Sequence, residues 1–429
     1  MLPWTDDMSR SEETKETVFR LRWFVLFVMG LVIFGTYYAY DAVSPIADFI
    51  MKGMNITRAQ YGLLFSFYYL PNFVMVLVGG ILLDRIGIRK AGTLFAALCA
   101  AGVFLTASSK IFSLMLVGRL IYGLGSESLI ITQSKVLSKW FRGKELALAF
   151  GLNLTVARLG TFAALNTAAR IQEWSGSWRL AIWVSSIIMF LSFALFFVYS
   201  GLDKTKERYF VKEKAEGEEE KFVFRDIFRF KPSFWHISLL CMTFYSAIFP
   251  FTAFSTVFLQ TKFGFSAVKG GFYTSLVISG SMVFTPLFGF VADKIGRRAT
   301  MMILGSLILV PVHLSLGLTH FAPAAAMVVL GVSFSLVPAA MWPAIPIMVE
   351  EKRLGTAFGL MTLIQNVGLT LFNWLAGRLT DLADGDYTNT ILMFASLGLL
   401  GLIFSLLLKR SAAKEGSGIE LPTKLAQAS

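Results

Sequence analysis

The chain has 429 residues, of which 55% are hydrophobic and only 15% are charged, and its mean hydropathy is +0.66. A soluble domain of ordinary surface charge does not have this composition, so we expect the chain to lie in a lipid bilayer. The formal net charge of +12 does not indicate nucleic-acid binding, because the basic residues lie between apolar runs and form no stripe with interleaved aromatic residues.

Apolar runs of about 20 residues, each long enough to cross about 30 Å of hydrocarbon, follow one another along the chain with short polar breaks. Twelve such runs can be counted. The predicted fold class is therefore an all-α integral membrane protein with twelve transmembrane helices in two six-helix bundles. With a cytoplasmic N-terminus, the inner loops carry about three times as many Lys and Arg as the outer loops, which places both termini in the cytoplasm.

Charge and hydropathy together predict five consecutive regions. They are a cytoplasmic tail at 1–22, an N-terminal bundle at 23–200, a charged cytoplasmic linker at 201–232, a C-terminal bundle at 233–408 and a cytoplasmic tail at 409–429. The linker is assigned from its composition, because it is mostly charged and includes the run KEKAEGEEEK. The first residues lack a cleavable signal pattern, so the first span is expected to act as its own signal anchor.

A short motif of glycine, acid, glycine and base occurs once in each half of the chain. Its positions pair at one offset of 209 residues: Gly80 with Gly289, Asp84 with Asp293, Gly87 with Gly296, and Arg89 with Arg298. An offset close to half the chain length indicates a duplicated unit. We expect the first glycine to allow close helix approach, the acid to cap a neighbouring helix, the second glycine to form a tight turn and the arginine to face the inner leaflet. We interpret these residues as gating elements at the cytoplasmic edge.

The two copies, GGILLDRIGIRK and GFVADKIGRR, resemble the signature of the major facilitator superfamily. Twelve spans and a charged central loop agree with this resemblance, which covers the whole chain. It implies a transporter that works by alternating access, with its site between the two bundles near the membrane midplane. It does not indicate the substrate.

Two ionisable residues are predicted near the midplane. Glu127 lies about fifteen residues into the fourth span and Arg158 about twelve residues into the fifth, at a rise of 1.5 Å per residue. Charged residues at this depth cost about 2.5 to 3.5 kcal/mol each on insertion scales, so they indicate a pathway. They either form a fixed salt bridge between helices or line a polar cavity. An acid and a base at one depth suit a zwitterion such as a peptide, whose carboxylate would bind the guanidinium by two bonds.

The segment Gly123–Gly160 is similar to the corresponding part of the lysosomal dipeptide uniporter branch of this superfamily. That branch has a GESL-type fourth helix, a WFKGKEL-type loop and an ARIG-type fifth helix, and YAYDAVSPI and LLFSFYYLPN in the first two spans add weaker support. The resemblance implies that Glu127 and Arg158 occupy the positions used for the amino and carboxyl ends of a peptide. It also implies facilitated diffusion of dipeptides or tripeptides. Ser126 departs from the pattern, because the family has glycine there.

Further candidates surround this pair. Arg119 lies in GRLIYGLG, which resembles the R-x-x-x-G element that the superfamily links to proton coupling, and Asp41 is a candidate partner or proton acceptor. A snorkelling or helix-pairing arginine and a solvated acid near the outer mouth are the alternatives. Side chains with a polar tip or an amide are expected around the peptide backbone, with packing or interface anchoring as the alternative: Tyr37, Tyr40, Tyr245, Trp342, Gln365 and Asn366.

We therefore interpret the chain as a secondary transporter of small peptides, working as a uniporter. The alternative is a proton-coupled transporter of another small organic acid or anion, with Arg119 and Asp41 carrying the coupling. An enzyme is not predicted, because no nucleophile with a base appears, and the three histidines lack metal-ligand spacing, so neither metal nor cofactor is expected. The expected partners are a small-molecule substrate and the bilayer. Short outer loops leave little room for a companion subunit, and they favour a bacterial inner membrane over a lysosomal membrane.

Overall fold

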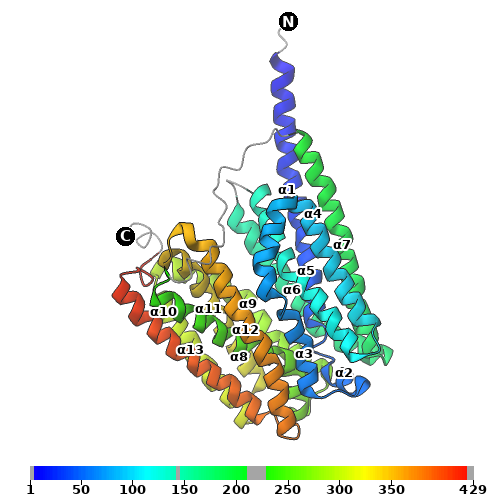
Figure 1. Cartoon of the computed structure of the whole chain (residues 1–429), viewed down its shortest axis with the longest axis vertical. Coiled ribbons are helices and arrows are strands. Elements are labelled where there is room, and N and C mark those ends of the chain that lie inside the picture. Colours follow the sequence, from blue (N-terminus) through cyan, green and yellow to red (C-terminus); the bar gives the residue numbers. More distant parts are fainter. Residues whose placement is uncertain (1–3, 142–144, 210–228, 423–429) are drawn as a thin grey trace.

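The computed structural model describes residues 4–141, 145–209 and 229–422, and the regular elements in these ranges are helices. The helices of the N-terminal half are α1 (Trp4–Asp41), α2 (Ala47–Met54), α3 (Arg58–Tyr69), α4 (Asn72–Ser108), α5 (Phe112–Trp140), α6 (Leu146–Ser175) and α7 (Trp178–Tyr209). Those of the C-terminal half are α8 (Pro232–Phe263), α9 (Ala267–Ile295), α10 (Arg298–Leu318), α11 (Pro323–Met348), the short 3₁₀ turn η2 (Glu351–Arg353), α12 (Leu354–Leu382) and α13 (Thr388–Glu415). Figure 1 shows the two halves as separate bundles, α1–α7 on the right and α8–α13 on the left.

The membrane spans follow from helix length and from one bend. Among the described residues, eleven helices are long and apolar enough to cross a membrane. Helix α4 changes direction at Gly87, whose φ of 81° is rarely adopted by residues with a side chain, so α4 holds parts of two traverses. Helix α3 and the start of α4 make the second traverse, and the part of α4 after Gly87 makes the third. The predicted twelve-helix, two-bundle architecture is confirmed.

Local sequence signals explain several helix ends. Helix α3 begins with a capping box, in which the side chains of Thr57 and Gln60 each accept a hydrogen bond from the other's backbone N–H. Helices α6 and α8 end at Gly176 and Gly264, both in the left-handed conformation that favours glycine. Helix α2 was not predicted; it is a short amphipathic helix that buries Ala47, Ile50 and Met51 and contacts α3 and α8.

The helices extend beyond the predicted domain boundaries. Helix α1 begins at Trp4, within the predicted tail, although its apolar span covers Leu21–Asp41. Helix α13 continues to Glu415, past the predicted boundary at 408. Within the predicted linker, α7 reaches Tyr209 and α8 begins at Pro232, while residues 210–228 lie outside the described part of the chain. The exact limits of the five predicted regions therefore stay a prediction.

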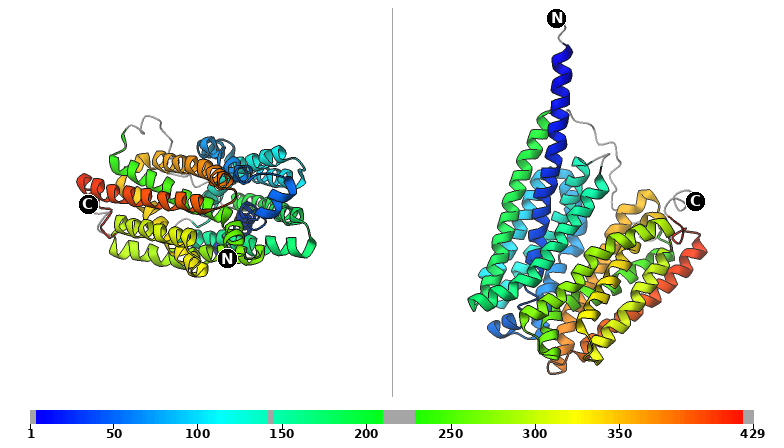
Figure 2. Two further views of the ribbon diagram at one scale, coloured as in Figure 1. Left: turned by 90° about the horizontal axis from the view of Figure 1, so that it is seen from below. Right: turned by 180° about the vertical axis from the view of Figure 1, so that it is seen from behind.

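The bundles meet at one end and diverge at the other. In Figures 1 and 2 the start of α1 and the end of α13 lie on the side where the bundles separate. The distribution of Lys and Arg assigns that side to the cytoplasm, so the contact lies on the outer side. The structure is therefore inward-facing, with its outer side closed.

A carboxylate of one bundle caps a helix of the other on the outer side. Asp381 of α12 accepts hydrogen bonds from the backbone N–H groups of Arg58 (3.0 Å) and Ala59 (2.8 Å) at the start of α3. The Arg58 guanidinium also lies 3.8 Å from the same carboxylate. A helix N-terminus carries partial positive charge and free N–H donors, so this contact stabilises the closed outer side.

Glycines allow the backbones of α3 and α12 to touch beside this cap. A Cβ atom added at Gly62 would lie 2.2 Å from the carbonyl oxygen of Asn373, and one added at Gly377 would lie 2.1 Å from that of Arg58. Neither position has room for a side chain, because the obstructing atoms belong to the backbone. Small residues at both positions are therefore a condition for closing the outer side.

The first glycine of each motif copy is not in close contact with a neighbouring helix in this conformation. A Cβ atom at Gly80 or at Gly289 would meet nothing within 4 Å, unlike the glycines of the outer side. The acid of the first copy does not cap a helix, because the Asp84 carboxylate accepts a hydrogen bond from the ammonium group of Lys135 on α5. The predicted close approach is thus absent at Gly80 and Gly289 in this conformation, and the predicted cap is absent at Asp84, whereas the predicted tight turn at Gly87 is present.

The arginines of the motif turn inward, and the expectation that they face the inner leaflet is wrong for Arg298. Its side chain is only 1% exposed and donates a hydrogen bond to the carbonyl oxygen of Leu421 (3.0 Å), beside Asp293 at 3.4 Å. The chain after α13 folds back over the start of α10, which covers this arginine. Arg89 of the first copy lies 4.0 Å from Asp203 at the end of α7, within its own bundle.

Candidate substrate-binding site

A cavity of about 310 Å³ lies between the two bundles. Helices α1, α3, α5 and α6 line it from the N-terminal half, and α8, α9, α11 and α12 line it from the C-terminal half. All residues predicted to contact substrate lie on its wall, together with Asp41: Tyr37, Tyr40, Glu127, Arg158, Tyr245, Trp342, Gln365 and Asn366. The structure thus brings into one cavity residues that are more than 300 positions apart in the chain.

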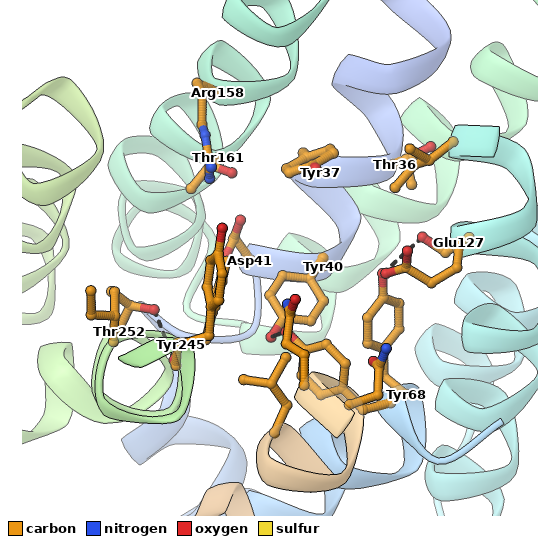
Figure 3. Close-up of a pocket in the computed structure, with 18 of the residues that line it drawn as sticks. Thr36, Tyr37, Tyr40, Asp41, Tyr68, Glu127, Arg158, Thr161, Tyr245 and Thr252 are labelled. Atoms are coloured by element: carbon orange, nitrogen blue, oxygen red, sulfur yellow. Dashed lines mark hydrogen bonds between the residues drawn. The ribbon is translucent and has the colours of Figure 1, made fainter. Parts of the chain in front are cut away.

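The two carboxylic acids and the one guanidinium of the wall all come from the N-terminal bundle. Asp41 ends α1, Glu127 lies in α5 and Arg158 lies in α6, and each is half-buried. Figure 3 shows Glu127 and Arg158 on opposite sides of the cavity, with Tyr37 between them. No ion pair joins Glu127 and Arg158 within the described ranges, so the fixed salt bridge considered from sequence is not formed in this conformation.

Arg158 reaches across to the other bundle. Its guanidinium carbon lies 4.9 Å from the centre of the Phe334 ring of α11. On its own side, Thr161 lies one turn further along α6, and Asp41 lies below it in Figure 3. The guanidinium therefore sits at the boundary between the bundles, where a bound anion would be in contact with both.

Tyrosines form the wall next to Glu127. The Tyr68 and Ser126 hydroxyls are hydrogen-bonded at 2.8 Å, and Ser126 directly precedes Glu127 in α5. The Tyr40 and Tyr69 hydroxyls are hydrogen-bonded at 2.6 Å. The related family has glycine at the position of Ser126. In this chain the Ser126 hydroxyl is hydrogen-bonded to Tyr68 and so holds one of these tyrosines in place.

Arg119 does not line the cavity. It is 2% exposed, its Nε donates a hydrogen bond to the carbonyl oxygen of Leu64 (2.8 Å), and no ion pair with Asp41 exists in the part of the chain that the structure describes. The predictions that the Arg119 side chain snorkels to the membrane interface or pairs with Asp41 are therefore wrong for this conformation. Four aromatic rings surround its guanidinium at 5.4 to 5.6 Å: Tyr40, Phe65, Tyr68 and Tyr122. Arg119 links α5 to the aromatic wall by cation–π contacts.

The C-terminal bundle contributes aromatic rings and amides without charge. The indole Nε1 of Trp342 donates to the Tyr245 hydroxyl at 2.9 Å, which fixes both side chains. The amide of Asn72 at the start of α4 donates to Asn366 Oδ1 at 3.3 Å, across the bundle boundary. The side-chain oxygen of Gln365 faces the thiol of Cys241, 3.5 Å away.

Sequence reasoning missed several residues of the wall. The twin tyrosines Tyr68 and Tyr69 shortly before Pro71 were a usable signal, because a tyrosine hydroxyl inside a membrane span usually needs a hydrogen-bond partner. Phe249 and Phe334 carried no such signal, because phenylalanine is ordinary in a membrane span. Four threonines, Ser126 and five aliphatic residues of the wall were also missed: Thr36, Thr161, Thr252, Thr362, Ser126, Ile130, Leu165, Ile248, Ile278 and Leu369.

Comparison with known proteins settles the family. Residues 29–285 and 270–427 match the Major Facilitator Superfamily. The chain belongs to this superfamily. The lysosomal dipeptide transporter MFSD1 of Danio rerio is 36% identical over 371 residues, which cover 83% of this chain and 80% of that protein. The protein of the same name from Homo sapiens is 32% identical over 405 residues, or 91% of this chain and 87% of that protein.

A solved structure supports the fold. The inward-facing, occupied crystal structure of a bacterial homologue of the human lysosomal transporter Spinster superposes with a TM-score of 0.70 at 17% identity, over 92% of this chain and 98% of that one. The resemblance of this chain to the superfamily and to its dipeptide branch is confirmed. This superfamily member is a multi-pass membrane transporter, and its relatives are transporters and not enzymes.

Proposed function

We propose that this transporter moves small peptides, dipeptides first and tripeptides second, across the membrane. In this proposal it works by alternating access as a facilitative uniporter. One observation carries the proposal: an acid and a base, without an ion pair between them, face each other across one cavity at the bundle boundary. In this proposal Arg158 binds the peptide carboxylate by two parallel hydrogen bonds, and Glu127 binds the ammonium group. The names of the relatives, which are dipeptide transporters, support the same substrate class.

The rest of the wall suits the middle of a peptide. Its amides and hydroxyls, among them Gln365, Asn366 and Tyr245, offer donors and acceptors to a peptide backbone. The volume of about 310 Å³ lies at the small end of the range for small-molecule sites, roughly 300 to 1,000 Å³. A short peptide is therefore favoured over a longer one.

Exchange between two bundle arrangements moves the substrate in this proposal. In the structure the outer side is closed by the Asp381 cap and the glycines Gly62 and Gly377, and the bundles separate on the cytoplasmic side. Rocking of the bundles opens that contact and brings the cytoplasmic ends together. We assign the gating of the inner side to the motif residues Gly80, Asp84, Gly87, Arg89, Asp293, Gly296 and Arg298. The first glycine of each copy, Gly80 and Gly289, has open space around it in this conformation.

Counterflow in proteoliposomes tests the uniport mechanism. Vesicles loaded with an unlabelled dipeptide should accumulate the labelled dipeptide without an ion gradient, and a pH dye inside them should report no proton movement. Acidification that accompanies dipeptide uptake would favour the proton-coupled alternative, with Asp41 in the cavity wall as the proton carrier. Counterflow of a simple organic anion without counterflow of dipeptides would contradict the peptide assignment.

We also propose that the protein works without an accessory subunit in a bacterial inner membrane. The short outer turns support this, such as the few residues between α4 and α5 and between α6 and α7. They leave little protein outside the bilayer for a companion to contact. The relatives bear the name of lysosomal transporters, so expression and localisation in the source organism distinguish the two membranes.

A further inference from the structure

A phenylalanine of the C-terminal bundle forms a platform for Arg158. The guanidinium lies over the face of the Phe334 ring, with its central carbon 4.9 Å from the ring centre. Phe334 itself is 2% exposed, so its ring is held by packing. This contact joins α6 to α11 and therefore connects the two bundles within the cavity.

Neighbouring rings fix the orientation of the platform. Tyr245 meets Phe334 at 6.3 Å with an interplanar angle of 88°, and Phe249 meets it at 5.6 Å with an angle of 84°. Edge-to-face contacts of this kind are favourable and directional. Tyr245 is in turn held by the indole of Trp342 at 2.9 Å. The Phe334 ring has little freedom to turn away from Arg158.

The contact with the ring affects which part of the Arg158 guanidinium is available to bind a substrate. Where a guanidinium stacks on an aromatic face, its N–H donors point outward in the plane of the group. A carboxylate binds a guanidinium in that same plane by two parallel bonds. A ring below the arginine thus presents the two-pronged edge to the cavity and keeps water from one face.

We propose that Phe334 is a positioning residue that sets Arg158 for recognition of the peptide carboxylate. The inference rests on the proposed function, in which Arg158 binds that carboxylate. Because Phe334 belongs to the opposite bundle, it holds the guanidinium only while the two bundles are arranged as in this structure. Carboxylate recognition is thereby connected to the conformational cycle, by a residue that carries no charge.

The test compares the purified full-length protein bound to a dipeptide and to the same dipeptide with an amidated C-terminus. Wild type should bind the free acid more tightly than the amide, and Phe334→Leu should reduce that preference about tenfold, because the cation–π contact is lost. Phe334→Met, an unbranched side chain of similar length, should do the same and serves if the leucine variant does not fold. Phe334→Tyr should keep the preference, because it retains the ring.

Phe251→Leu is the matched control. It removes a buried ring of α8 that does not line the cavity and packs on Phe258 and Phe394, away from Phe334, so it should leave the preference for the free acid unchanged. If wild type binds no dipeptide, or binds acid and amide equally, the proposed function is wrong. If wild type prefers the acid and both Phe334→Leu and Phe334→Met keep this preference, the positioning role is wrong and the proposed function stands.

Discussion

Arg158→Ala is expected to lower the initial rate of dipeptide uptake into proteoliposomes by about 30-fold or more. Removing one partner of a buried, hydrogen-bonded charge pair costs about 2 to 5 kcal/mol, and each 1.4 kcal/mol corresponds to a factor of ten. The carboxylate of the peptide would then lose its hydration water on entering the cavity without gaining contact with a cation. Initial rates over a range of peptide concentrations measure the loss.

Arg170→Ala is the matched control for this variant. Arg170 lies on the same helix, α6, but near its outer end, where it is exposed and does not line the cavity. Its loss should leave uptake within about twofold of wild type, since exposed surface substitutions have small effects. Uptake by folded, reconstituted Arg158→Ala protein at the wild-type rate would remove Arg158 from the site.

Gly377→Val is expected to prevent closure of the outer side and so to abolish transport. The new side chain would meet the backbone of α3, since even a Cβ atom lies 2.1 Å from the carbonyl oxygen of Arg58. Backbone atoms cannot rotate away as a side chain can, so α3 and α12 have to separate. The Asp381 cap at the start of α3 would be lost with this contact, because both lie on the same pair of helices. We therefore expect an outward-open protein.

Spin labels at the exposed outer positions Lys52 and Leu382 report this separation in double electron–electron resonance. Cys99 and Cys241 are both buried, which limits labelling elsewhere. Gly377→Val should shift the distance distribution to longer values. Gly80→Val, the same change where a Cβ meets nothing within 4 Å, should not lengthen it. Wild-type distances and uptake in the Gly377→Val protein would contradict the role of this glycine.

Short-range patterns were sufficient to predict the architecture. Span length, the duplicated motif and the positive-inside rule depend on local composition, so they indicated twelve helices, two halves and cytoplasmic termini. Glu127 and Arg158 were found by depth alone, because a charge in the middle of an apolar span is costly and therefore rare. The structure places both on the wall of one cavity.

Features that depend on contacts between distant helices were not predictable. Phe334 lies in an apolar span like many other aromatic residues, and only the position of α11 opposite α6 across the cavity brings its ring to a cation. Gly62 and Gly377 are two of 36 glycines, and nothing local distinguishes those that face another backbone. The burial of Arg298 depends on the chain after α13, which lies more than 100 residues away in sequence.

The assignment of Glu127 and Arg158 to the two ends of a peptide is the central claim, and ligand-dependent thermal unfolding of the purified wild-type protein tests it most directly. The ligands are one dipeptide, its N-acetylated form, its C-amidated form, the constituent amino acids, a sugar and a simple carboxylate. A ligand that binds the folded state raises the unfolding temperature. We predict the largest rise with the unmodified dipeptide and a smaller one when either end is blocked. Stabilisation by the sugar or the simple carboxylate without stabilisation by the dipeptide, or equal stabilisation by all three dipeptide forms, would contradict the account.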